Sequence, residues 1–429
     1  MARKMKDSGI EWIGEIPEGW ETINPKALFA QRKDRASKGE RQLTSSQQYG
    51  ILYQDEYMEL TGSKVVTVEK DFDILKHVEA GDFVISMRSF QGGLEYSTKS
   101  GAISSAYVML VPNLEFVYPR FYRWLLKSSV YIDALQRTTN MVRDGQAMRY
   151  SNFAQVRLFT LPLDEQKSRA DFLDVKCSNI DKILSKTCAS LEEYKKLKQA
   201  VITQAVTKGV RGEREMKDSE VEWIGEIPTS CSICKLKYLL KNPLKYGANE
   251  SGIPYSDSLP RYIRITDITP DGNLKCTGKL SLSEESAKDY ILEDGDILFA
   301  RSGATVGKTF IYYQSYGRSA YAGYLIKASL NNKVSPKFVY YYTCSSLYEV
   351  WKNSIFIQST IQNIGADRYA NLPVPVPKTL QEQEEIADYL DAKCAEIDGL
   401  IAKKEQLVKE LESYKKSLIY EVVTGKREV

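Results

Sequence analysis

Two kinds of polar loop recur at matching places in the two halves of this chain, and their side chains suit binding. One runs from Arg88 to Gly93 and from Arg301 to Thr309; the other spans Arg143–Tyr150 and Gln358–Asn363. Arginine, glutamine and asparagine can read base edges, while lysine, serine and threonine suit phosphates. By composition alone, ordinary solvated loops are favoured over base-reading loops. The candidate nucleic-acid-binding residues are Arg88, Ser89, Gln91, Arg143, Gln146, Arg149, Arg301, Ser302, Lys308, Thr309, Gln358, Thr360, Gln362 and Asn363.

Known catalytic patterns fit the sequence poorly. The run Gly303–Thr309 has three residues before Gly-Lys-Thr where a phosphate-cradling loop needs four. The Asn/Asp-Pro-Pro-aromatic signature of amino-methyltransferases is absent. Cys231 and Cys234 lack a second cysteine pair downstream, so two small half-buried residues are favoured over a zinc site, and the lone His77 indicates a structural role. We predict no catalytic residue, no metal and no cofactor.

The elements that carry these loops are repeated along the chain. Residues 6–17 recur at 217–228 with ten of twelve positions identical. Gly-bounded apolar runs end just before Arg88 and Arg301, which predicts strands leading into exposed loops. The runs 119–129 and 336–346 each predict one amphipathic helix. The sequence therefore predicts one unit duplicated in tandem.

Each half ends in a long charged helix, predicted over 164–208 and 380–424, about 65–70 Å each. Asp164 is expected to cap the first, and Thr379 with Glu382 forms a capping box for the second. Apolar residues recur at alternating steps of four and three, the seam of a coiled coil, so each helix should pair with the other. The predicted interface residues are Leu173, Ile180, Leu184, Leu191, Leu390, Ile397, Ile401 and Leu411.

Bulk properties limit the remaining possibilities. The 429 residues have room for two or three domains. No apolar run approaches 18 residues and no N-terminal signal pattern occurs, which predicts a soluble, cytoplasmic protein. Seven cysteines without framework spacing indicate reduced thiols. A net charge of +3 means that any nucleic-acid footprint is a local patch.

Taken together, the chain resembles the DNA-specificity subunits of type I restriction–modification enzymes. The resemblance rests on the repeated Glu-Trp-Ile-Gly-Glu-Ile-Pro box, on Gly295–Gly303, and on the runs 161–166 and 377–383, and it covers essentially the whole chain. It implies an α/β (α+β) fold: two similar target recognition domains separated by two long antiparallel coiled-coil helices. The expected bounds are 1–160 and 213–377 for the domains, 161–212 for the central spacer helix and 378–429 for the C-terminal one.

The resemblance also implies a function. Each globular domain is expected to bind one half of a split double-stranded DNA target. Two methyltransferase subunits would dock on the helices, restriction subunits would join them, and this subunit would itself be non-catalytic. The alternative is a coiled-coil adaptor that bridges two protein partners without reading DNA.

Overall fold

The computed structural model describes residues 3–68, 72–86, 89–138, 148–269, 272–303, 305–357 and 363–429. Two compact units account for the chain: unit 1 contains residues 1–188 and 406–429, and unit 2 contains residues 189–405. Each long helix therefore contributes one end to each unit. Among the described residues no helix combines the length and hydropathy needed to cross a membrane.

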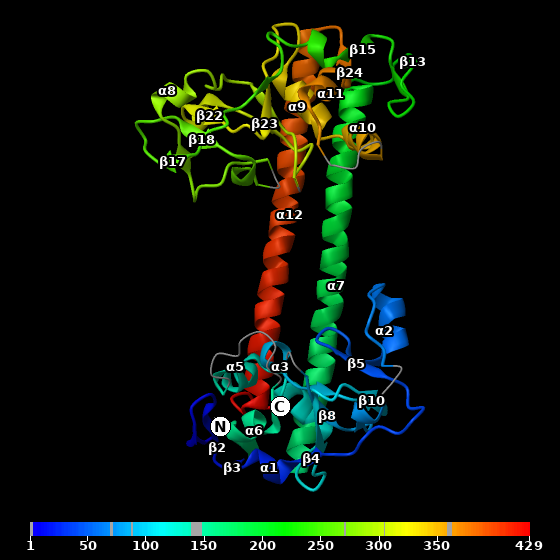
Figure 1. The fold of residues 1–429 in the computed structure, drawn as a ribbon, viewed down its shortest axis with the longest axis vertical. Coiled ribbons are helices and arrows are strands. Elements are labelled where there is room, and N and C mark those ends of the chain that lie inside the picture. The colour runs from blue at the N-terminus through cyan, green and yellow to red at the C-terminus, as the bar shows by residue number, and fades with distance from the viewer. Residues whose placement is uncertain are drawn as a thin grey trace. The chain divides into compact units, whose positions relative to one another are not determined.

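The globular part of unit 1 is built on a four-stranded antiparallel sheet in the order β4-β11-β8-β9 (Figure 1). Helices and two-stranded sheets accompany it, and Phe29, Phe83 and Phe121 lie in its buried core. The strands are β1 (Met5–Ile10), β2 (Gly14–Pro17), β3 (Glu21–Ile23), β4 (Phe29–Arg32), β5 (Leu43–Ser46), β6 (Gly50–Tyr53), β7 (Lys76–Val78), β8 (Phe83–Ile85), β9 (Glu95–Tyr96), β10 (Gly101–Ile103), β11 (Val108–Pro112) and β12 (Leu158–Thr160). The helices are α1 (Pro25–Leu28), α2 (Gln54–Thr61), η1 (Phe72–Ile74), α3 (Ser89–Gly92), α4 (Pro119–Leu125), α5 (Ser129–Arg137) and α6 (Tyr150–Gln155).

The globular part of unit 2 has an equivalent sheet, β16-β23-β20-β21, and a second four-stranded sheet, β17-β19-β18-β22. Its strands are β13 (Met216–Asp218), β14 (Glu226–Pro228), β15 (Cys231–Lys235), β16 (Lys245–Tyr246), β17 (Ile253–Pro254), β18 (Arg261–Ile263), β19 (Leu280–Ser281), β20 (Ile297–Ala300), β21 (Thr309–Ile311), β22 (Ser319–Tyr321), β23 (Leu325–Ala328) and β24 (Pro373–Pro377). Its helices are η2 (Leu236–Tyr238), η3 (Ile265–Asp267), α8 (Glu284–Ala287), η4 (Gln314–Tyr316), α9 (Pro336–Thr343), α10 (Ser346–Ile357) and α11 (Ala366–Ala370). The two copies of the sequence repeat therefore form four-stranded sheets with the same pattern of strand pairing.

The single amphipathic helix predicted in each half is instead two helices, α4 with α5 and α9 with α10. The break falls at Ser128 and Ser345. Each serine hydroxyl donates to a carbonyl three residues earlier and accepts the N–H three residues later, which ends one helix and starts the next.

The glycine–aspartate pairs ahead of β8 and β20 form a tight turn. Gly81 and Gly295 have φ of +105° and +84°, which a residue with a side chain rarely adopts. Asp82 and Asp296 are buried and accept the N–H of Glu79 and Glu293, at 3.0 and 2.8 Å. These turns start the strands that end at the candidate loops.

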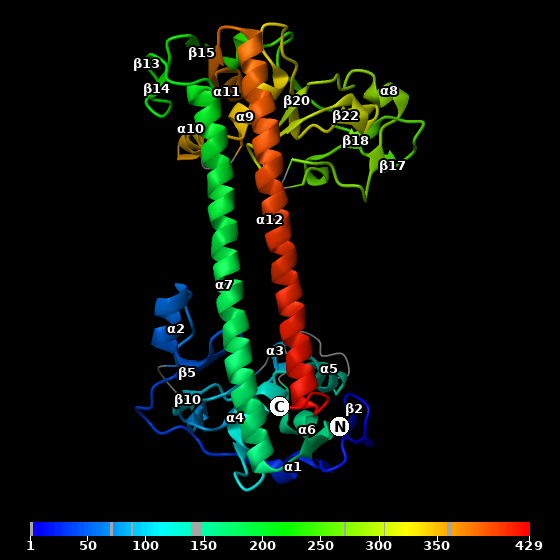
Figure 2. The ribbon, with the colours of Figure 1, turned by 180° about the vertical axis from the view of Figure 1, so that it is seen from behind.

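The long helices are α7 (Leu163–Lys208) and α12 (Leu380–Val423), which run antiparallel within each unit (Figure 1, Figure 2). Leu173, Ile180, Leu191, Leu390 and Ile397 are buried, and the remaining interface residues, Leu184, Ile401 and Leu411, are half-buried. In unit 1 the α7 seam packs against Leu418, Val422 and Val423 from the end of α12. In unit 2 the α12 seam packs against Ile202, Ala205 and Val206 from the end of α7.

A buried glutamine joins each long helix to its globular part. Gln166 accepts the Tyr118 N–H at 2.7 Å and donates to the carbonyls of Phe116 and Leu161, both at 2.8 Å. Gln383 repeats this arrangement, accepting from Ser335 and donating to Lys333 and Pro377.

The predicted caps had mixed outcomes. The Thr379 hydroxyl accepts the Glu382 N–H at 3.3 Å, as predicted, but the Glu382 carboxylate pairs with Arg214. The cap assigned to Asp164 is wrong: α7 begins one residue earlier, at Leu163, so Asp164 lies inside the first turn. The Pro162 carbonyl accepts the first intrahelical bond, from Gln166, because proline supplies the extended backbone that precedes a helix.

Candidate nucleic-acid interface

In unit 2 the first candidate loop joins β20 to β21, and two buried tyrosines hold its base. The Tyr369 hydroxyl donates to the Ala300 carbonyl at 2.9 Å, and the Tyr348 hydroxyl donates to the Gly307 carbonyl at 2.7 Å. Desolvation raises the pKa of both phenols well above the usual value, so both remain donors over the whole working range of pH. The ends of this loop are therefore fixed by the core.

Three segments meet at Arg301. Its N–H donates to the Tyr324 carbonyl at 3.0 Å, and its carbonyl accepts the Ile364 N–H at 2.8 Å. Ser302 and Asn363 form an antiparallel bridge beside it. The first candidate loop is thus brought against the end of the second, a contact that the sequence analysis did not predict.

The Arg301 side chain lies over an aromatic ring. Its guanidinium carbon is 5.0 Å from the centroid of Tyr246, whose hydroxyl accepts the Ala366 N–H at 3.0 Å. Among the described residues the buried Nε of Arg301 has no hydrogen-bond partner. The ring positions the guanidinium, whose remaining N–H groups suit an anionic or base-edge ligand.

The other candidates of unit 2 differ in availability. Lys308 and Asn363 are exposed, and Ser302 is half-buried. The Thr309 hydroxyl is already bonded to that of Thr343 at 2.7 Å, which makes it part of the frame. Gln358, Thr360 and Gln362 lie outside the described residues.

In unit 1 the described part of the candidate surface is smaller. Ser89 is buried, and its hydroxyl accepts the Ser86 N–H at 2.8 Å, so it holds the start of α3. Arg149 is exposed, and its N–H donates to Asn152 at the start of α6. Gln91 lies in α3, with its side chain outside the described part. Arg88, Arg143 and Gln146 also lie outside it.

Sequence reasoning missed the aromatic neighbours of Arg301. Tyr246 and Tyr324 are 41% and 62% exposed, which is unusual for large rings and leaves their faces available for stacking. No local pattern marks them, since Tyr246 precedes Arg301 by 55 residues and only the pairing of β16 with β23 brings it near. It also missed Lys352, whose side chain crosses Gly307 so closely that an added Cβ would lie 2.2 Å from its Cδ.

Alternative chemistry finds little support in the described part of the chain. Cys231 and Cys234 both lie in β15, three residues apart and so on opposite faces of the strand. No cluster of three or more His, Cys, Asp or Glu side chains suited to a metal occurs among the described residues. The seam thiol of Cys177 is buried, which raises its pKa to about 11 and keeps it protonated and unreactive.

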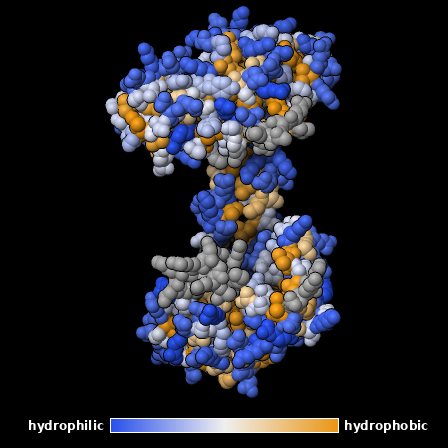
Figure 3. Space-filling view, viewed as in Figure 1, coloured by the Kyte–Doolittle hydropathy of each residue, from blue (hydrophilic) through white to orange (hydrophobic). Residues whose placement is uncertain are grey.

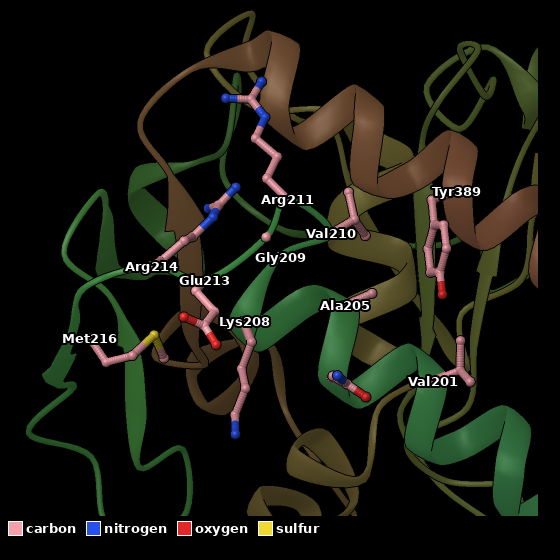
Figure 4. A pocket seen from close by; sticks show the side chains of 12 residues that line it. Val201, Ala205, Lys208, Gly209, Val210, Arg211, Glu213, Arg214, Met216 and Tyr389 are labelled. Carbon is pink, nitrogen blue, oxygen red and sulfur yellow. The ribbon is translucent and has the colours of Figure 1, made fainter.

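A cavity of about 490 Å³ opens in unit 2 where α7 ends, beside Tyr389 of α12 (Figure 4). Its lining includes no residue of the candidate loops. Its two arginines, Arg211 and Arg214, are paired with Glu385 and Glu382, so their charge is already compensated. The cavity is therefore separate from the candidate interface.

Comparison with known proteins adds independent findings. Residues 216–410 match the family of the type I restriction modification DNA specificity domain. The type I restriction enzyme MjaVIII specificity subunit of Methanocaldococcus jannaschii is 24% identical over 81% of this chain and 80% of its own length. The putative MjaX specificity subunit of the same organism is 24% identical over 96% of this chain and 95% of its own.

A solved structure shares the fold. It comes from work on complex assembly and conformational transition of the type I R-M system, and the matched chain has a TM-score of 0.72. The match covers 96% of this chain and 99% of that one at 14% identity, so the likeness is one of architecture.

Proposed function

We propose that this chain is a specificity subunit of the type I restriction–modification family and that it recognises a bipartite double-stranded DNA target. The globular part of unit 1, residues 1–160, reads one half-site, and that of unit 2, residues 213–377, reads the other. The chain directs its partners to the target in the cytoplasm and is itself a non-catalytic subunit.

One observation carries the proposal. The sheets and buried contacts of the two halves, which we call their frames, repeat, whereas the candidate loops differ. The four-stranded sheets share one strand order, and the buried Gln166 and Gln383 make equivalent bonds. Yet Arg88 is followed by Ser-Phe-Gln-Gly-Gly, whereas Arg301 is followed by Ser-Gly-Ala-Thr-Val. A frame that repeats under loops that differ suits a target whose half-sites have different sequences.

The proposed partners follow from this reading. Two methyltransferase subunits dock on the helices, restriction subunits join for cleavage, and 161–212 and 378–429 act as spacers between the readers. Binding of base edges falls to the glutamines, asparagine and arginines of the loops, and Lys308 takes a phosphate.

The test is binding of duplex DNA by the chain in complex with its methyltransferase subunits, over a range of salt concentrations. We expect the logarithm of the affinity for the target to fall steeply and linearly with the logarithm of the salt concentration, because phosphate contacts release counterions. Methylation mapping of the host DNA with and without the gene should then give two half-sites and an unread gap. Salt-independent binding, or methylation unchanged by loss of the gene, favours the adaptor.

A second test concerns the spacer. Adding one heptad to each helix adds about 10 Å of helix, equal to roughly 3 base pairs of duplex. The unread gap should lengthen accordingly while both half-sites keep their sequences. An unchanged gap in the methylated target contradicts the spacer role.

A further inference from the structure

In the described part of unit 2, one arginine of the second sheet is buried without a carboxylate partner. Arg261 is 8% exposed, and the hydrogen bond that its side chain makes within the described ranges joins Nη2 to the Lys275 carbonyl at 2.7 Å. Neither Nε, which is buried, nor Nη1, which reaches the surface, has an acceptor in these ranges. Burying a charge is costly unless the charge is paired, so a counterion for Arg261 is expected here.

A tyrosine and a lysine lie beside this arginine. Arg261 pairs with Ser281 across β18 and β19, so their side chains lie on one face of the sheet. The Ser281 hydroxyl accepts the Ser256 N–H at 3.1 Å, which brings the neighbouring Tyr255 to that face. The Lys279 ammonium lies 5.1 Å from the centroid of the Tyr255 ring, which is 41% exposed. We call Arg261, Lys279 and Tyr255 the Tyr255 cluster.

One carboxylate lies near the cluster without neutralising it. Asp257 accepts the Tyr255 hydroxyl at 2.8 Å. This bond raises the pKa of Tyr255, and the positive charge of Arg261 opposes the shift, so the guanidinium lies close to the phenol. Neither Arg261 nor Lys279 forms an ion pair with Asp257 or with another carboxylate of the described chain. The cluster therefore keeps a positive charge.

Unit 1 contains an equivalent cluster. Arg41 corresponds to Arg261, since each precedes a residue that pairs in parallel with the middle of an equivalent strand, β10 or β22. The guanidinium carbon of Arg41 lies 3.6 Å from the centroid of the Tyr53 ring, and the Lys99 ammonium lies 4.6 Å from it. Both halves therefore place an arginine and a lysine around one tyrosine.

The two clusters differ in their counterions. In unit 1 carboxylates at the start of α2 pair with both cations, Asp55 with Arg41 at 2.7 Å and Glu56 with Lys99. Nothing in the described part of unit 2 takes the place of these two carboxylates. An anion from outside the chain can therefore complete the Tyr255 cluster as Asp55 and Glu56 complete its counterpart.

The surroundings of the Tyr255 cluster suit a phosphate group. Arginine, lysine and serine are the side chains that commonly contact phosphate oxygens. The hydroxyls of Ser256 and Ser258, 2.8 Å apart, lie next to Tyr255 in the chain and supply further donors. The lobe of unit 2 that carries β17, β18 and β22 presents blue polar residues beside pale and orange ones (Figure 3).

We propose that Arg261 and Lys279 bind a phosphate group beside the Tyr255 ring, at a site outside the candidate loops. The inference rests on the proposed function, in which this phosphate belongs to the DNA backbone. Such a contact positions the duplex and carries no sequence information. It also belongs to unit 2 alone, because the equivalent cations of unit 1 are already neutralised.

The experiment measures duplex affinity over a range of salt concentrations, with the chain in complex with its methyltransferase subunits. Arg261→Gln and Lys279→Gln should each weaken binding to every sequence alike, by about tenfold. Each should also reduce the slope of log affinity against log salt by about 0.9. Arg41→Gln is the matched control and should leave the slope unchanged, because Asp55 already pairs with that cation. Asp257→Asn removes the neighbouring negative charge and should tighten binding.

A second measurement distinguishes DNA from free phosphate. The full chain without DNA is titrated with inorganic phosphate, against chloride of equal ionic strength, and its melting temperature is followed. A smaller salt slope in the Arg261 and Lys279 variants assigns the phosphate to DNA. An unchanged slope, with a melting temperature that phosphate raises in wild type and not in Arg261→Gln, supports the site but assigns it to free phosphate.

The remaining outcomes overturn the inference or the function beneath it. If neither the slope nor the response to phosphate changes in the variants, no phosphate binds at the Tyr255 cluster. If Arg261→Gln instead loses a protein subunit, the occupant is a carboxylate and the inference is wrong. A wild-type complex whose affinity for duplex is independent of salt contradicts the proposed function, while the phosphate titration still tests the site. Lys279 is only half-buried, so its variant keeps the test valid if Arg261→Gln fails to fold.

Discussion

The two units fasten the start of one long helix to the end of the other by different chemistry. In unit 1 the guanidinium of Arg169, 1% exposed, donates to the Val422 and Arg427 carbonyls at 2.8 and 2.9 Å and to Glu165. In unit 2 the same place, 217 residues on, holds Ile386, which packs in the apolar core. The buried Arg169 and the buried Ile386 therefore hold equivalent helix junctions. We call the Arg169 contacts the polar lock and the Ile386 contacts the apolar lock.

The residues around the two locks differ accordingly. Glu165 accepts from Arg3, Arg169 and the Trp20 indole; these bonds outweigh desolvation and lower its pKa to about 2. In unit 2 Cys231 takes the place of Trp20, and Glu382 pairs with Arg214 alone among the described residues. The two helix junctions therefore have the same geometry, although different contacts hold them.

The largest expected effect comes from the seam, which the two units share. Ile180→Asp in unit 1, or Ile397→Asp in unit 2, places an unpaired charge at a site that is 6% or 5% exposed. Each should cost about 3 kcal/mol or more of unfolding free energy. Hydrogen exchange should show the loss mainly in the unit that carries the change. Equal protection in variant and wild type would mean that the helices do not pair as described, and Val175→Asp is the exposed control.

Substitutions in the polar and apolar locks should have the next largest effect, and the loss of unfolding free energy should be larger in unit 1 than in unit 2. Arg169→Met removes the donor to the Arg427 carbonyl, one of the two donors to the Val422 carbonyl and the buried partner of Glu165, which should cost about 2–4 kcal/mol. Ile386→Met exchanges one apolar side chain for another of similar volume and should cost less than about 1.5 kcal/mol. Chemical denaturation compares the pair directly. Equal losses would show that Arg169 contributes no more than packing.

Substitutions in the candidate loops of unit 1 and unit 2 should each weaken recognition of a different half-site. Gln362→Ala should weaken recognition of one half-site, and Gln146→Ala that of the other, each by about 1–3 kcal/mol and at one base position. Lys308→Ala should weaken all sequences alike and reduce the salt slope by about 1. Binding to targets randomised at one half-site at a time provides the measurement. A substitution that affects both half-sites equally excludes that residue as a reader.

The smallest effect is a histidine-dependent response to pH, which belongs to unit 1 because His77 is the single histidine in the chain. Burial lowers the pKa of His77, but hydrogen bonds to Glu79 and Glu40, at 3.0 and 2.9 Å, raise it by more. A raised folded pKa stabilises unit 1 below the unfolded value near 6.5, and this contribution disappears as pH rises through the folded pKa. His77→Gln should therefore lose more stability at pH 6 than at pH 8.5, by less than about 1 kcal/mol. An equal loss at both pH values would contradict the pairing.

The sequence predicted the repeat and the seam because both are periodic. Heptad spacing alone identified Leu173 and Leu390, and both are fully buried. It could not predict the break at Ser128 and Ser345, because the same serine is neutral on a helix surface and a cap once its hydroxyl finds the right N–H. Nor could it place Tyr246 beside Arg301, since that contact depends on strand pairing between distant segments. Local pattern specifies elements, and tertiary pairing assembles the site.

The discontinuity of unit 1 has a consequence for synthesis on the ribosome. Its core includes Leu418, Val422 and Val423, and Arg169 bonds to the Val422 and Arg427 carbonyls, so the first unit to be translated lacks part of its interior until residues 406–429 have been made. Unit 2 is contiguous, and all of its residues emerge before residue 406. At about 5–20 residues per second, the delay between residue 188 and the missing helix end is roughly 10–45 s. The half made first is therefore completed last, and it exposes an apolar surface to chaperones throughout that interval.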